Sequence, residues 1–221
     1  MTACASSKST TASSNQIELA NINVQLGTAY LANGDPMRAK QKLLMAMQEA
    51  PRYPASWYAM GLYLEKTGEK GKAKEYYQKA IQLGPQDGAA QNNYGTFLCR
   101  QKQYRESIKH FMIAVNDPGY LSGSEAYENA GICALQIPDK KLAENLLAKS
   151  LQIDPARPVP LIELAKLKSA QGDNQLALDY IERFLSSYQP TKAILVLAEK
   201  IAQQANNPLL AEKYSTLLKK E

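Results

Sequence analysis

The chain has 221 residues, of which 45% are apolar and 21% are charged, a composition typical of folded proteins and not of disordered ones. Its net charge is +5, and its 26 basic residues are scattered among 21 acidic ones, so nucleic-acid binding receives little support. No stretch reaches the roughly 18 consecutive apolar residues of a membrane-spanning helix. The three cysteines are too few for a disulfide scaffold and lack the close pairing of a zinc site.

Residues 1–19 are predicted to form a disordered tether, because residues 5–15 contain almost no apolar side chain. Thr2, Ala3 and Cys4 form the small-small-Cys run that follows the apolar stretch of bacterial lipoprotein signal peptides. No apolar stretch precedes them, so we expect a shortened sequence whose mature N-terminus is Cys4. In that interpretation Cys4 carries the acyl chains of a membrane anchor. The motif alone also fits an accidental thiol in a disordered tail.

A repeat runs through the rest of the chain. Gly27, Gly61 and Gly95 are 34 residues apart, Gly131 follows after 36, and Ala165 after another 34. Each unit has one large aromatic or aliphatic residue in its second helix, called here the closing residue. A proline then ends that helix. The closing residues are Leu43, Tyr77, Phe111, Leu147 and Ile181, and the prolines are Pro51, Pro85, Pro118, Pro155 and Pro190.

This pattern matches the tetratricopeptide repeat, most completely in the run from Trp57 through Gly61, Ala73 and Tyr77 to Pro85. The small residues are expected where paired helices cross most closely. We therefore predict an all-α fold, a right-handed superhelical solenoid of about six helix-turn-helix units without strands. The predicted repeats are 20–53, 54–87, 88–123, 124–157, 158–190 and 191–221, the last being a degenerate cap.

The chain lacks the residues of a catalytic or cofactor site. His110 is the only histidine, which leaves little room for Ser-His-Asp or Cys-His chemistry. The glycines occupy helix positions and form no phosphate-binding loop after a strand. We expect no enzyme activity, no cofactor, no metal site and no small-molecule substrate.

A partner-binding groove is predicted on the first helices of the repeats. Its positions lie at fixed sequence distances from the repeating small residue of each unit, the Gly or Ala described above, which is called here the landmark residue. Such a groove, mainly apolar with isolated polar groups, suits an extended or helical peptide. The alternative is that these residues pack against neighbouring helices and that contact occurs on the convex side or an edge. The groove positions are Val24, Thr28, Leu31, Tyr58, Leu62, Glu65, Asn92, Thr96, Cys99, Glu128, Ile132, Leu135, Ile162, Lys166 and Ser169, with Asn93 beside them.

The third and fourth repeats resemble the PilW/PilF family of type IV pilus biogenesis and stability lipoproteins. The resemblance rests on the runs Asn92 to Gly95, Phe97 to Cys99, Asp117 to Tyr120 and Tyr127 to Cys133. It implies a pilotin, lipid-anchored through Cys4 on the periplasmic side of the outer membrane.

Such a pilotin binds the secretin subunit and other pilus assembly proteins, and it acts in secretin localisation and multimerisation or in pilus stability. The alternative is a generic periplasmic adaptor in envelope or peptidoglycan assembly. In an oxidising periplasm Cys99 and Cys133 could form a disulfide or remain two buried thiols.

Overall fold

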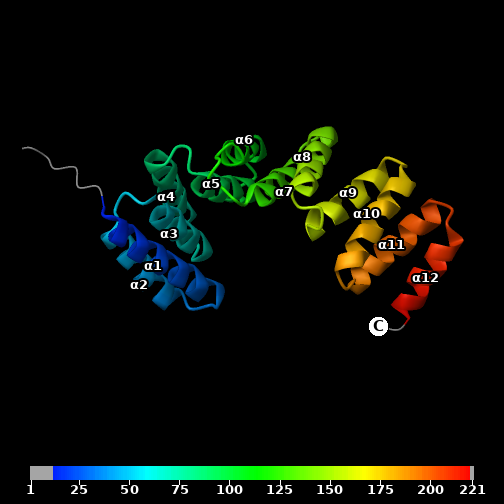
Figure 1. The fold of residues 1–221 in the computed structure, drawn as a ribbon, viewed down its shortest axis with the longest axis horizontal. Coiled ribbons are helices and arrows are strands. Elements are labelled where there is room, and N and C mark those ends of the chain that lie inside the picture. The colour runs from blue at the N-terminus through cyan, green and yellow to red at the C-terminus, as the bar shows by residue number, and fades with distance from the viewer. Residues whose placement is uncertain (1–11, 220–221) are drawn as a thin grey trace, which may run out of the picture. The chain divides into compact units, whose positions relative to one another are not determined.

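The structure is a computed structural model that describes residues 12–219. These residues form twelve helices and no strand, which confirms the predicted all-α repeat fold (Figure 1). The chain divides into two compact units, residues 1–97 and 98–221, with the boundary inside one helix, α5. Each unit is described by itself.

Unit 1 contains two complete helical hairpins and most of α5. Helix α1 contacts α2, and α3 contacts α4; α3 also contacts both helices of the first hairpin. This is the tetratricopeptide arrangement, in which each hairpin covers the open side of its predecessor. The helices are α1 (Ser14–Ala32), α2 (Pro36–Glu49), α3 (Pro54–Lys66), α4 (Lys70–Leu83) and α5 (Gly88–Arg100).

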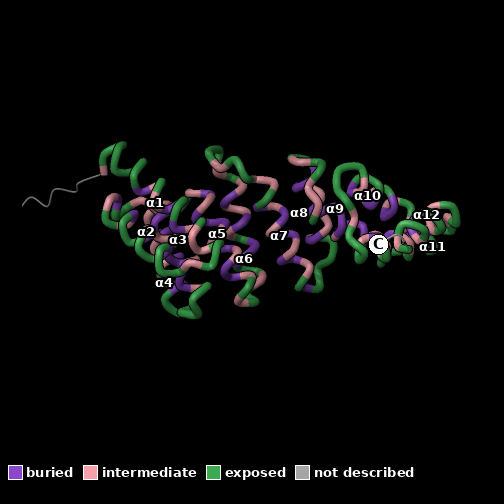
Figure 2. The backbone as a smooth tube through the Cα atoms, turned by 90° about the horizontal axis from the view of Figure 1, so that it is seen from below, coloured by how far each residue is buried: buried purple, intermediate pink, exposed green. Residues whose placement is uncertain are grey.

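Unit 2 follows the same plan. Helix α7 contacts α8, α9 contacts α10, and α11 contacts α12, while successive hairpins meet through α8 with α9 and α10 with α11. Buried residues recur along the helices, whereas most residues of the turns are exposed (Figure 2). The helices are α6 (Tyr104–Ala114), α7 (Gly123–Ala134), α8 (Lys140–Ile153), α9 (Pro158–Ala170), α10 (Asn174–Ser187), α11 (Lys192–Gln204) and α12 (Pro208–Leu218).

Side-chain caps and prolines mark the start of many of the helices. Four second helices, α2, α8, α10 and α12, begin after an Asp or Asn whose side chain accepts a hydrogen bond from a first-turn backbone N–H. The first helices α3 and α9 begin at a proline, which is tolerated there because first-turn N–H groups have no partner within the helix. The prolines predicted to end second helices all lie just beyond the ends of those helices.

The landmark glycines lie where paired helices approach most closely. A Cβ atom on Gly27 would lie 2.7 Å from the Leu43 side chain, and one on Gly131 would lie 2.6 Å from Leu147. At Gly61 the Tyr77 ring would be 3.2 Å away. The residue facing each glycine is therefore the one that closes the repeat in the sequence pattern.

The first helix begins earlier than predicted. Helix α1 begins at Ser14, so the predicted tether is wrong for residues 14–19. The reason is a capping box: the Ser13 hydroxyl accepts from the Gln16 N–H, and the Gln16 side chain accepts from the Ser13 N–H. Cys4 and the rest of residues 1–11 lie outside the described residues.

Candidate partner-binding groove

The predicted groove positions of unit 1 lie on α1, α3 and α5. Val24 and Asn92 are buried, whereas Thr28, Leu31, Tyr58 and Leu62 are half-buried. Because α1 contacts α3, the half-buried residues of these two helices belong to one surface. That surface is mostly apolar and can supply contact area to a partner.

The polar groups predicted for this surface are largely engaged by their own helices. The Thr28 hydroxyl donates to the Val24 carbonyl at 3.0 Å, and the Thr96 hydroxyl donates to the Asn92 carbonyl at 2.8 Å. The Asn93 amide donates to the Ala89 carbonyl at 2.8 Å. These hydroxyl and amide groups therefore donate to backbone carbonyls of their own helices.

Glu65, the remaining groove position of unit 1, is also occupied. Its carboxylate accepts a hydrogen bond of 3.3 Å from the hydroxyl of Tyr77, the residue that faces Gly61. Glu65 therefore links the groove side of α3 to the core of its own hairpin.

In unit 2, Glu128 forms an ion pair inside the predicted groove. Its carboxylate, only 11% exposed, accepts from the Arg157 guanidinium, which stands at the start of α9. This hydrogen bond raises the pKa of Arg157. The pair links α7 to α9, so Glu128 is held in place and is not presented alone to a partner.

The other predicted groove positions of α7 and α9 differ in how far their side chains are buried. Ile162 is buried in the core cluster of unit 2, so it packs against neighbouring helices as the alternative interpretation proposed. Ile132 and Leu135 are half-buried. Lys166 and Ser169, one turn and two turns further along α9, reach the surface.

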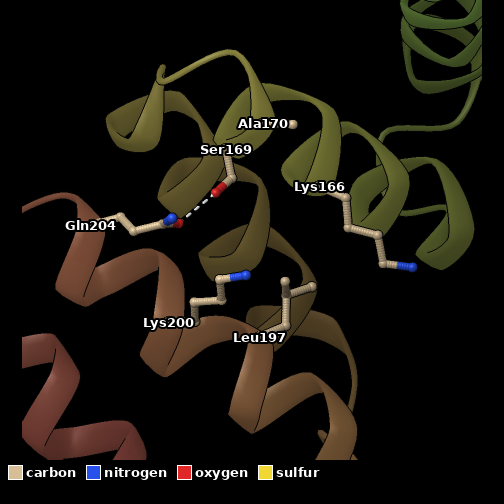
Figure 3. A pocket seen from close by; sticks show the side chains of 6 residues that line it. All are labelled: Lys166, Ser169, Ala170, Leu197, Lys200 and Gln204. Carbon is tan, nitrogen blue, oxygen red and sulfur yellow. Dashed lines mark hydrogen bonds between the residues drawn. The ribbon is translucent and has the colours of Figure 1, made fainter.

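Lys166 and Ser169 line a cavity of about 210 Å³ between α9 and α11 (Figure 3). The Ser169 hydroxyl donates to Gln204 Oε1 across the cavity at 2.8 Å. Sequence reasoning missed the α11 side because the last repeat was interpreted only as a cap. The other lining residues are Ala170, Leu197, Lys200 and Gln204.

Cys99 and Cys133 are joined by a disulfide, with their Cα atoms 5.9 Å apart. The bond fastens the end of α5 to α7, two first helices of consecutive repeats. Cys133 is fully buried, and its sulfur also lies 3.2 Å from the Ser107 hydroxyl of α6. The disulfide thus joins α5 to α7, and the Cys133 sulfur also contacts α6.

Within residues 12–219 no group of three or more His, Cys, Asp or Glu side chains is arranged to hold a metal ion. In the same range no helix is long and apolar enough to cross a membrane. His110 is partly buried on α6, and this burial lowers its pKa.

The fold and the groove define a tetratricopeptide-repeat protein. The family model of the tetratricopeptide repeat matches residues 54–87, the second predicted unit. The crystal structure of PilW, described as a widely conserved type IV pilus biogenesis factor, superimposes with a TM-score of 0.78 and 29% identity, covering 92% of this chain and 94% of PilW.

PilF of Pseudomonas aeruginosa, a type IV pilus assembly protein, is 28% identical over 197 residues, which are 89% of this chain and 78% of PilF. Its solved structure has a TM-score of 0.82 and covers 93% of both chains. An uncharacterized protein of Haemophilus influenzae is 32% identical over 62% of this chain and 77% of its own length. The chain belongs to the family of type IV pilus tetratricopeptide-repeat proteins that includes PilF and PilW.

Proposed function

We propose that this chain is a pilotin, a lipid-anchored and non-catalytic scaffold that delivers the pilus secretin to the outer membrane and promotes its multimerisation. The observation that supports this most is the agreement with PilF and PilW, which extends over nearly the whole chain and not over one repeat. A tetratricopeptide fold alone would not suggest a particular pathway, because the same repeat serves many functions.

The groove supports a role in binding. In unit 1 it offers half-buried apolar residues on α1 and α3 whose polar neighbours are engaged with their own backbone. Such a surface gains contact energy from apolar area and loses little by desolvation of polar groups. We propose that a secretin segment lies along this surface.

The membrane anchor is proposed at Cys4, outside the described residues. Nine residues, 5–13, separate it from α1, and each spans at most about 3.6 Å when extended. A lipidated Cys4 would therefore keep unit 1 within reach of the periplasmic surface of the outer membrane. The attached acyl chains would supply the anchoring energy, at about 0.8 kcal/mol per buried methylene.

The test is secretin multimer abundance in outer-membrane fractions of a deletion strain complemented with wild type, Cys4→Ala or the control Ser7→Ala. We expect multimers to disappear on deletion, to be misplaced with Cys4→Ala, and to be normal with Ser7→Ala. Persistence of multimers with loss of surface pili would indicate that the protein stabilises the fibre instead. If neither changes, the protein is a general envelope adaptor and the pilotin proposal is wrong.

A groove variant tests the binding surface separately. Leu62→Glu places a charge on the half-buried surface of α3, whereas the control Gln78→Glu makes a charge change on an exposed position of α4. We expect purified protein with Leu62→Glu to bind the secretin at least tenfold more weakly, because a charge at an apolar contact must be desolvated. Equal binding by both variants would place the contact elsewhere.

A further inference from the structure

The cavity between α9 and α11 is lined by hydrogen-bond donors and by no acidic residue. Its six lining residues are two lysines, one glutamine, one serine and the two apolar residues Ala170 and Leu197 (Figure 3). Lysine and glutamine side chains present N–H donors, and a donor-rich surface of positive charge is complementary to an anion. Lys166 and Ser169 also occupy groove positions of the repeat, so the cavity lies on the predicted partner-binding side of α9.

Gln204 accepts two hydrogen bonds from its neighbours, one at its side chain and one at its backbone. Its side-chain oxygen accepts from the Ser169 hydroxyl at 2.8 Å, and its backbone carbonyl accepts from the Asn174 amide at 3.1 Å. Ser169 lies in turn 3.2 Å from Asn174 Oδ1. With its oxygen occupied, the Gln204 amide keeps two N–H donors for a ligand.

Lys200 supplies the charge. Its side chain extends from α11 between Gln204 and Leu197 (Figure 3). Among the described residues, none forms an ion pair or hydrogen bond with the Lys200 amine. Lys166 is different, because its amine donates to Glu163 Oε1 on the same helix at 2.7 Å. Lys200 and the Gln204 amide are therefore the two groups available to an incoming acceptor.

We propose that this cavity binds the carboxylate of an Asp or Glu side chain within an extended segment of a protein partner. Lys200 and Gln204 would donate to the carboxylate, while Leu197 and Ala170 would contact an adjoining apolar residue. Lys166, Ala170, Lys200 and Gln204 are all exposed, so the cavity is open and a chain can continue past it. A side chain therefore fits better than a chain end. The inference rests on the proposed scaffold function and adds the chemistry of one contact.

The experiment is an NMR titration of the ¹⁵N-labelled full chain with three five-residue peptides. The first is acetyl-Ser-Leu-Glu-Leu-Ser-amide, the second replaces Glu by Gln, and the third is the Gln peptide with a free C-terminal carboxylate. We expect the Glu peptide to shift the amide resonances of the lining residues of α9 and α11. We expect both Gln peptides to bind about fivefold more weakly, the range of an exposed ion pair.

Two protein variants with matched controls locate the contact. Lys200→Gln removes the charge, and its control Lys192→Gln makes the same change at an exposed position at the start of the same helix. Gln204→Glu introduces a repelling carboxylate, and its control is the exposed neighbour Gln203→Glu. We expect about fivefold weaker binding of the Glu peptide by Lys200→Gln and Gln204→Glu, and wild-type binding by both controls.

Three results would overturn the proposal: no shifts at α9 and α11, equal affinity for the Glu and Gln amide peptides, or preference for the free C-terminal carboxylate. Failure here is distinguishable from failure of the pilotin function. If the peptide does not bind but secretin multimers still require the protein, only the cavity assignment falls. If the peptide binds but deletion leaves multimers unchanged, the carboxylate site stands and the pilotin proposal falls.

Discussion

The hairpins α7–α8 and α9–α10 occupy the same place in consecutive repeats, yet they carry different small residues, Gly131 and Ala165, at that place. In α7–α8 the crossing is so close that a Cβ on Gly131 would lie 2.6 Å from the Leu147 side chain and 3.2 Å from the Leu147 backbone nitrogen. In α9–α10 the same position is Ala165, which is fully buried in one core cluster with Ile181. Helix α7 is also fastened to α5 by a disulfide through Cys133.

This difference shows that the repeat does not require glycine as such. It requires a small residue whose size suits the shape of the side chain that faces it. Leu147 places its branched end against α7, so no side chain fits at residue 131. Ile181 leaves space for one methyl group at residue 165, and that methyl adds buried apolar area.

Removing the disulfide that joins α7 to α5 should have the largest effect on stability. The double substitution Cys99→Ala with Cys133→Ala should lower the free energy of unfolding by about 3 kcal/mol, because the cross-link closes a loop between residues 34 apart. Denaturant unfolding measures this loss. A reducing agent should lower wild-type stability to the level of the variant, and the control Cys4→Ala should change nothing. Unchanged stability of the double variant would mean that packing alone holds α7.

Placing a larger side chain at the close crossing of α7 and α8 should lower the free energy of unfolding somewhat less than removal of the disulfide does. Gly131→Val should lower the free energy of unfolding by about 2 kcal/mol, because the added carbons meet both the Leu147 side chain and backbone and cannot be relieved by a rotamer change. The control is Gly71→Val in α4, where an added Cβ meets no atom within 4 Å. Thermal unfolding should separate the two variants. Equal stability would show that α7 and α8 can move apart freely.

The repeat register could be predicted because close helix crossings leave a period in the sequence. Gly27, Gly61 and Gly131 each lie at such a crossing and face the residue that closes the unit. The start of α1 was missed although its signal, Ser13 followed by Gln16, is visible in the sequence. The low apolar content of the preceding residues favoured a tether in the prediction, but the capping hydrogen bonds of Ser13 and Gln16 begin the helix there.

The groove was harder to predict than the fold. Repeat spacing placed Lys166 and Ser169 on the α9 side of a cavity, but it could not place Lys200 and Gln204 opposite them. Their position depends on how α11 packs beside α9, which the repeat spacing does not fix. Nor could spacing show that Glu128 pairs with Arg157, because the pair joins residues 29 apart through the tertiary fold.

A substitution of alanine by glycine in the hairpin α9–α10 tests the same position in the opposite direction. Ala165→Gly should lower the free energy of unfolding by about 1 kcal/mol, since it removes a buried methyl group and places glycine inside a helix. Denaturant unfolding of this variant and of Gly131→Val under the same conditions measures both losses. A gain in stability would mean that α9 and α10 prefer the closer crossing and that Ala165 holds them apart.

The smallest effect concerns one of the two ion pairs that, among the described residues, join these hairpins, the pair between Lys168 and Glu144. Lys168 of α9 donates to Glu144 of α8 at 2.6 Å, and Gln171 donates to the other carboxylate oxygen at 3.0 Å. These hydrogen bonds, first that of Lys168 and then that of Gln171, lower the pKa of Glu144 below its usual value. The stabilisation is therefore fully present above the unfolded-state pKa of about 4.3 and is lost as the pH falls through the lower folded-state pKa.

Lys168→Met should accordingly reduce the free energy of unfolding at neutral pH by about 0.5 kcal/mol, since solvent screens a pair this close to the surface. The difference from wild type should shrink toward zero as the pH falls through the lowered folded-state pKa of Glu144, because the carboxylate is then protonated. The control is Lys166→Met, which breaks a pair within α9 only and leaves the two hairpins joined. A difference that stayed constant with pH would mean that Lys168 stabilises the junction by packing its aliphatic stem and not through the charge of Glu144.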